Sequence, residues 1–137
     1  MDTAGVQVTA LHPDSVGRVP GLDLGRPISD AQRDAIDAAT DRFAVLVFPC
    51  QALDDIQLVA LGSRFQTIED AATGAYRDPR RIGNAQIDDV SNLCLDGSIM
   101  TAVDRHRMSS LGNPLWHSDS SFKTVAAGYA VLHARVI

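Results

Sequence analysis

The sequence predicts a mixed α/β fold for this chain of 137 residues. Two segments combine a helix-capping signal with apolar residues at helical spacing, and several short runs are rich in apolar or β-branched residues, as in strands. Polar stretches with glycine and proline separate these elements. A content of 45% hydrophobic and 21% charged residues is typical of a globular domain with one core.

The first strand is expected at Val6 to Leu11, where apolar and polar residues partly alternate. Glycines and prolines then predict turns before the first helix. This helix is expected after Ser29, because Ser29 and Gln32 have the spacing of a capping box. Its buried face is expected to contain Ile36, Ala39 and Phe43.

The second strand is expected at Ala44 to Phe48, a continuous apolar run closed by Pro49. Such a run is typical of a strand buried on both faces. A second helix is expected directly afterwards, since Asp54 and Gln57 repeat the capping pattern, and it should end near Phe65. Its buried stripe is expected to contain Ile56, Val59, Ala60 and Leu61.

The remaining chain is less regular. Residues 66–81 are polar and are expected to form a long loop. A short strand is expected at Gln86 to Val90, and Asp96-Gly97 predicts a tight turn before an extended segment from Ser98 to Ala102. Tyr129 to Ile137 is apolar and β-branched, which favours a well-buried strand.

Charge and composition exclude several functional classes. A net charge of -5 and a pI near 5.1 give no basic surface for nucleic acid, so a small-molecule partner is expected. No apolar run approaches the roughly 20 residues of a membrane helix, and the N-terminus lacks the pattern of a secretory signal. The two cysteines lack metal or redox spacing, which favours a reduced, cytoplasmic protein. A homo-oligomer remains open.

The strongest chemical signal is the pair His117 and Asp119. In an extended backbone, residues two apart project to the same side, so an imidazole and a carboxylate can hold one cation. Non-haem iron(II) oxygenases use such a pair with one further histidine and leave open coordination positions. Taken alone, the pair also fits a turn histidine beside a capping aspartate, because the adjacent serines favour turns.

The surrounding residues are more specific. The string Asn113 to Phe122 resembles the TauD/TfdA family of Fe(II)- and 2-oxoglutarate-dependent dioxygenases, and within it the branch acting on aryloxyalkanoates. Further family-like segments follow in the family's order: Leu11-His12-Pro13, Gly21 to Leu24, Val45 to Phe48, Val90 to Leu93 with Asp96-Gly97, and Tyr129 to Val136.

The resemblance implies a double-stranded β-helix, or jelly roll, with two flanking helices. Residues 1–137 are then expected to be a single partial domain, the incomplete N-terminal part of a protein about twice as long. It also implies Fe(II) as cofactor and 2-oxoglutarate and O2 as cosubstrates. The expected reaction hydroxylates a small anionic organic acid, aryloxyalkanoate-like or sulfonate-like.

By the same resemblance, His117 and Asp119 are the first two iron ligands, and Asn113 matches a position lining the substrate pocket in the taurine branch. The third ligand, a distal histidine, and the arginine that binds 2-oxoglutarate are expected beyond Ile137, while His133 matches a packing position. An anionic substrate needs cationic partners, although each candidate also fits a solvated surface arginine. These candidates are Arg77, Arg80, Arg81, Arg105 and Arg107.

Two departures from the family pattern lie outside the metal motif. Gln66 follows Phe65 where the family usually has glycine, and Pro49-Cys50 replaces the usual Arg-Gly. Two other functional readings stay open. One is a catalytically inactive truncated remnant acting as an oligomeric or binding module. The other is a zinc hydrolase using His117 and Asp119, which has little support because catalytic zinc usually takes three protein ligands.

Overall fold

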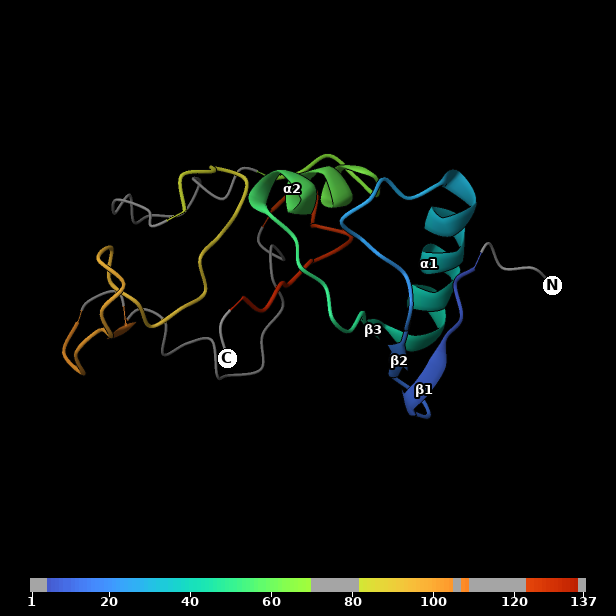
Figure 1. Ribbon diagram of the computed structural model, residues 1–137, viewed down its shortest axis with the longest axis horizontal. Helices are drawn as coiled ribbons and strands as arrows, with labels where there is room; N and C mark the ends of the chain where they lie inside the picture. The colour runs from blue at the N-terminus through green and yellow to red at the C-terminus, as the bar shows by residue number, and fades with distance from the viewer. Residues whose placement is uncertain (1–4, 70–81, 105–106, 109–122, 136–137) are drawn as a thin grey trace. The chain divides into compact units, whose positions relative to one another are not determined.

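The computed structural model describes residues 5–69, 82–104, 107–108 and 123–135 (Figure 1). The chain divides into two compact units, the first formed by Met1–Thr67 with Val131–Ile137 and the second by Ile68–Ala130. The first unit contains a small sheet and both helices, so the mixed α/β prediction is confirmed. No helix in the described ranges has the length and apolar character needed to span a bilayer.

The sheet of the first unit has three strands in the order β1-β2-β3. β1 (Thr9–His12) pairs antiparallel with β2 (Val16–Arg18), and β2 pairs parallel with β3 (Val45–Val47). A parallel pair needs a crossover connection, which a helix between β2 and β3 supplies. The first strand begins later than predicted, because its pairing with β2 starts at Thr9; Val6 lies in the hydrophobic core ahead of the paired residues.

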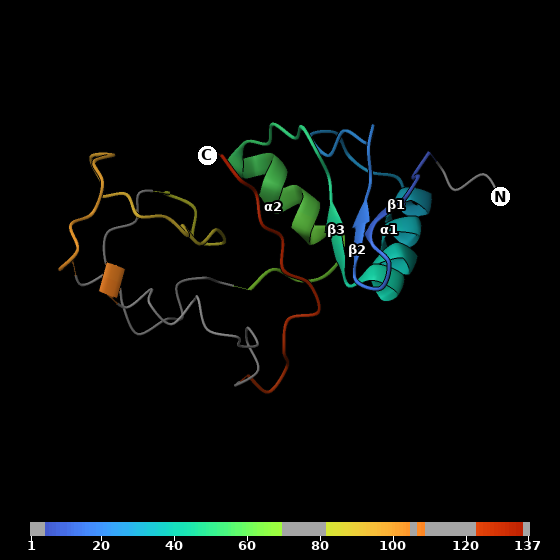
Figure 2. The ribbon, with the colours of Figure 1, turned by 90° about the horizontal axis from the view of Figure 1, so that it is seen from below.

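The crossover helix α1 (Asp30–Phe43) has the predicted capping box. The backbone N–H of Gln32 donates to Ser29 Oγ at 3.2 Å, and the Ser29 N–H donates to Gln32 Oε1 at 2.9 Å. Ile36 and Ala39 are buried and Phe43 is half-buried, as the spacing predicted. α1 packs against β2 and β3 and lies along one side of the strands in Figure 2.

Gly17 lies at a close approach between α1 and the sheet. A Cβ atom on Gly17 would lie 2.7 Å from Val8 Cγ1, 2.9 Å from Leu46 Cδ2 and 3.0 Å from Phe43 Cδ2. Leu46 therefore points toward α1, and its neighbours Val45 and Val47 point to the opposite face. That face is open, with Val45 52% and Val47 40% exposed, so the prediction of burial on both faces is wrong.

Helix α2 (Asp55–Ser63) also has its predicted capping box, with the Gln57 N–H donating to Asp54 Oδ1 at 2.7 Å. Leu61 is buried, but Ile56 is 78% exposed and Ala60 is also exposed, so the predicted stripe is wrong at Ile56 and Ala60. The helix instead contacts the core through Leu58, Leu61 and Phe65, which lie at i, i+3 and i+7. The core of the unit consists of Val6, Val19, Leu22, Leu24, Ile28, Ile36, Leu53 and Leu61.

The described part of the second unit is organised by turns. Leu93 and Ile99 form an antiparallel bridge around the predicted Asp96-Gly97 turn, in which Gly97 has a φ of +82°. An extended segment was predicted from Ser98 to Ala102. Within it, the described structure has strand-like pairing only at Ile99.

Two predicted strands are wrong. Residues 86–90 and 129–135 contain no strand in the described structure, because no strand-pairing ladder includes them there. The expected burial of the last segment is also wrong in its described part, since Leu132 is 86% exposed. Residues 70–81 of the predicted long loop lie outside the described residues.

Candidate metal and substrate site

Most predicted site residues fall in ranges that the structure does not describe. These are the proposed ligands His117 and Asp119 and the proposed substrate residues Asn113, Arg77 and Arg81, together with Arg80 and Arg105. Arg107 is described and is exposed, and its backbone N–H donates to Asp104 Oδ1 at 3.4 Å.

No group of three histidine, cysteine, aspartate or glutamate side chains in the described ranges could hold a metal ion. His133 instead contacts the protein backbone, with Nε2 3.3 Å from the Gln51 carbonyl oxygen. Nε2–H can donate to this carbonyl, and the other ring nitrogen, Nδ1, is buried without a hydrogen-bond partner. These contacts fit the packing position that the resemblance implied.

Gln51 anchors one of the family-like segments, Gly21 to Leu24. Its Oε1 accepts from the Leu24 N–H at 2.8 Å, and its Nε2 donates to the Leu22 carbonyl at 2.8 Å and to the Pro49 carbonyl at 3.0 Å. One amide side chain thus satisfies a backbone donor and two backbone acceptors. It ties the segment after β2 to the segment after β3.

Gln57 adds a second anchor immediately after this segment. Its Oε1 accepts from the Asp54 N–H at 2.9 Å and completes the helix cap, while Nε2 donates to the Gly25 carbonyl at 3.0 Å. The sequence identified Gln57 only as a capping residue and missed Gln51. A signal was available for Gln57: the helix cap does not use its NH2 group, and a part-buried amide donor requires an acceptor.

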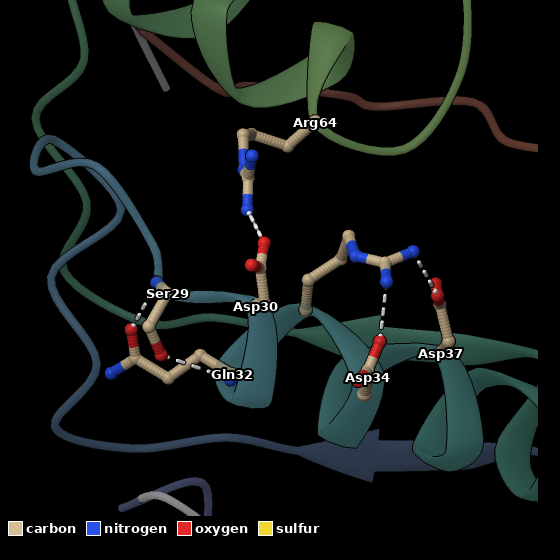
Figure 3. A network of polar contacts seen from close by, with 7 residues as sticks. Ser29, Asp30, Gln32, Asp34, Asp37 and Arg64 are labelled. Atoms are coloured by element: carbon tan, nitrogen blue, oxygen red, sulfur yellow. Dashed lines mark hydrogen bonds and ion pairs between the residues drawn. The ribbon is translucent and has the colours of Figure 1, made fainter.

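Ion pairs complete the connections around α1 and α2. Arg64 donates to Asp30 Oδ1 at 2.5 Å and links the end of α2 to the first turn of α1 (Figure 3). On the surface of α1, Arg33 Nη2 lies 2.6 Å from Asp34 Oδ1, and Arg33 Nη1 lies 3.5 Å from Asp37 Oδ2. Arg135 pairs with Asp55, so residues 131–135 contact the first turn of α2.

In the second unit, Asp96 organises the turn of the family-like segment Val90 to Gly97. Its Oδ1 accepts from the Ser98 hydroxyl at 2.6 Å and from the Ser98 N–H at 2.9 Å. The hydroxyl first, and the backbone N–H second, hold the pKa of the Asp96 carboxyl below its ordinary value of 3.8. Such bonds favour the charged carboxylate.

The chain is similar to known proteins over most of its length. The family model described as taurine catabolism dioxygenase TauD, TfdA family, matches residues 7–137. The chain belongs to the TauD/TfdA dioxygenase family. Members of this family use Fe(II) and 2-oxoglutarate (α-ketoglutarate).

Its relatives act on aryloxyalkanoates. An α-ketoglutarate-dependent 2,4-dichlorophenoxyacetate dioxygenase of Burkholderia sp. (strain RASC) is 38% identical over 127 residues, covering 93% of this chain and 43% of that protein. An (S)-phenoxypropionate/α-ketoglutarate dioxygenase of Delftia acidovorans is 31% identical over 136 residues, covering 96% of this chain and 42% of that protein.

A solved structure shares the fold. The crystal structure of AAD-2 in complex with Mn(II) and N-oxalylglycine has a TM-score of 0.82 and 37% sequence identity. The match covers 89% of this chain and 43% of AAD-2. The chain thus spans less than half the length of these relatives.

One of the departures from the family pattern named above lies at a left-handed backbone position. Cys50 stands where the family usually has glycine, and it adopts a φ of +58°. Side chains other than glycine rarely adopt this left-handed conformation. The backbone after β3 therefore has a geometry that favours glycine at a position occupied by cysteine.

Proposed function

We propose that this chain supplies the N-terminal part, with two of the three metal ligands, of an Fe(II)- and 2-oxoglutarate-dependent dioxygenase. The family match over residues 7–137, which includes the His117 and Asp119 motif, carries this proposal. The proposed fold is the first part of a jelly roll, with residues 1–137 as a single partial domain. The third ligand and the arginine for 2-oxoglutarate belong to the remaining part of the family domain.

The proposed donor set suits the metal. A neutral imidazole from His117 and a carboxylate from Asp119 are the ligand types of the facial triad, and they leave room for a bidentate cosubstrate. When bound, iron and 2-oxoglutarate activate O2 for hydroxylation of a carbon atom in the substrate. The contribution of this chain is to hold the metal by two side chains and to orient the substrate beside it.

We propose a small anionic organic acid, aryloxyalkanoate-like or sulfonate-like, as the substrate. The named activities of the relatives support the aryloxyalkanoate class. Guanidinium groups pair bidentately with carboxylates, so Arg77, Arg81 and Arg107 are the proposed partners of the substrate anion. Asn113 is proposed to line the same pocket.

A chimera provides the test. Residues 1–137 replace the matching part of the Burkholderia sp. relative, and the protein is titrated anaerobically with Fe(II) and 2-oxoglutarate. We expect the visible absorption of the iron chelate, and phenol release from 2,4-dichlorophenoxyacetate faster than sulfite release from taurine. His117→Ala and Asp119→Ala should remove both signals, because two protein ligands do not retain the metal.

Matched controls are His12→Ala and Asp41→Ala, exposed residues of the first unit that the proposal leaves outside the site. Both should keep the absorption and the turnover. A folded chimera without the absorption contradicts the proposal and favours the inactive binding module. Loss of signal in the controls to the same degree as in the ligand variants contradicts the ligand assignment.

A further inference from the structure

Asp96 and Gly97 form the one Asp-Gly pair of the sequence, which has no Asn-Gly pair. Both residues are exposed, and a Cβ atom on Gly97 would have no described atom within 4 Å. Because glycine has no side chain, its backbone nitrogen is open to approach by the carboxyl carbon of the preceding residue. An exposed Asp-Gly pair is therefore the place where this chain most readily closes a succinimide ring.

We propose that Asp96 is a site of spontaneous isoaspartate formation and that the Ser98 hydroxyl sets its rate. In the first step the Gly97 nitrogen bonds to Asp96 Cγ, and the hydroxyl of the protonated carboxyl leaves as water together with the amide proton. A water molecule then adds to the backbone carbonyl carbon of Asp96 and breaks its bond to the Gly97 nitrogen. The product has an unchanged mass, but the chain now runs through Cβ and Cγ of residue 96. Neither step needs an oxidant, a metal or the proposed function.

The turn restrains both reacting groups. The Gly97 N–H donates to the Cys94 carbonyl at 2.9 Å. Asp96 Oδ1 accepts from the Ser98 hydroxyl at 2.6 Å and from the Ser98 N–H at 2.9 Å, and both bonds favour the charged carboxylate. Ring closure needs a free nitrogen and a protonated carboxyl, so these hydrogen bonds must first be released. The hydroxyl of Ser98 is the one partner that a side-chain substitution removes.

The same turn has little to keep it closed. Its pairing consists of the Cys94 N–H donating to the Ser98 carbonyl at 2.8 Å and the bridge between Leu93 and Ile99. Residues 95–99 are all exposed, so the turn has no core of its own. Segments with few buried apolar contacts open locally while the rest of a protein stays folded. We therefore expect the reaction to proceed in the folded protein through the opened turn.

Ageing of the protein provides the test. The 137-residue chain and the chimera described above are incubated for several weeks at mildly acidic pH. Isoaspartate is counted with an isoaspartyl methyltransferase and located by peptide fragmentation. We expect it at residue 96 in the folded proteins, at a rate several-fold below that of the chain unfolded in urea. Ser98→Ala should raise the folded rate about fivefold, because one hydrogen bond to the carboxylate is lost.

Two matched variants separate the hydroxyl contact from a general loosening of the turn. Ser98→Thr keeps a hydroxyl and should keep the slow rate. Ser91→Ala removes a hydroxyl that accepts from the Leu93 N–H at 3.4 Å, away from Asp96, and should also leave the rate unchanged. Asp96→Glu should form no isoaspartate at this position, because its longer side chain closes a larger ring far more slowly.

The outcomes that contradict the proposal are equally specific. The absence of isoaspartate at residue 96 in the folded proteins, where the unfolded chain forms it, overturns the site. Equal rates in the unmodified protein and Ser98→Ala overturn the role of Ser98. Equal acceleration by Ser91→Ala or Ser98→Thr overturns it as well, in favour of a loosened turn.

A structural measurement gives a second readout that needs no variant. An additional backbone carbon at residue 96 shifts the pairing of Cys94 with Gly97 and Ser98. Aged protein should therefore give new NMR amide resonances for Cys94 and Ser98, while the amides of Ser29 and Gln32 in the first unit keep theirs. Unchanged turn resonances in protein that contains isoaspartate at residue 96 would contradict the described turn pairing.

Discussion

Residues 5–67 and residues 82–104 are stabilised by different means. The first range contains both helices, all three strands and a cluster of buried apolar side chains. In the second range the described structure has two buried hydrophobic residues, Ile87 and Met100, and one bridge closed by a turn. Order in the first unit therefore depends on a core, and order in the described part of the second unit depends on local hydrogen bonds. Substitutions of the same kind in the two units test this difference.

The largest expected effect is that of a core deletion in the first unit. Leu22→Ala should lower the free energy of unfolding by about 3 kcal/mol, because it removes buried methyl groups and leaves a cavity. Urea unfolding followed by the helical circular dichroism signal measures it. The matched variant Ile87→Ala should leave this transition unchanged. An equal shift from both variants would show that the units unfold together and that the comparison fails.

A substitution at Gly17 should have the next largest effect. A methyl group there meets Val8, Leu46 and Phe43 within 3.0 Å, so Gly17→Ala should destabilise the first unit by about 2 kcal/mol. Gly83→Ala is the control, since a Cβ at Gly83 has no neighbouring atom within 4 Å. Thermal unfolding measures both. Similar losses in the two variants would mean that α1 does not pack as closely on the sheet as described.

The left-handed residue after β3 should give a gain. Cys50→Gly should raise the stability of the first unit by about 1 kcal/mol, because glycine adopts a positive φ without a Cβ clash. Cys50→Ala removes the thiol but keeps the Cβ atom, so it should give no gain. A stabilisation of equal size in both variants would trace the effect to the thiol rather than to the backbone.

The smallest effect is expected at the Asp96 turn and depends on pH. The folded-state pKa of Asp96 lies below 3.8, so the turn gains stability from the carboxylate above that pH and loses it as the pH falls through the folded value. The amide resonance of Ser98, followed by NMR from neutral to acidic pH, should shift as this bond is lost. In Asp96→Asn the shift should be absent, and its persistence would assign it to another group.

The elements that the sequence predicted correctly are those defined by local spacing. Ser29 with Gln32 and Asp54 with Gln57 specify their helix starts within four residues, and both capping boxes are present. Burial was predicted less well. Val45 and Ile56 are exposed because burial depends on which elements lie opposite, and these are distant in the sequence. The strands predicted at 86–90 and within 129–135 are absent for the same reason.

The family was predictable from the sequence because the string around His117 and Asp119 is long and specific. The match of the family model to residues 7–137 confirms the predicted family. The roles of those two residues, and of Asn113, Arg77, Arg81 and Arg107, stay predictions. The structural role of Gln51 was not predictable. Its partners are backbone groups of Leu22 and Leu24, which carry no sequence signal for a distant amide.

The contacts of residues 131–135 have a consequence for the order of folding. His133 meets Gln51 and Arg135 meets Asp55 across separations of 82 and 80 residues. During synthesis the helices and sheet of residues 5–67 leave the ribosome first. The two contacts can form only after the whole intervening chain has been made. Folding of the first unit is thus expected in two stages, with a scaffold that forms early and is joined last by the segment at residues 131–135.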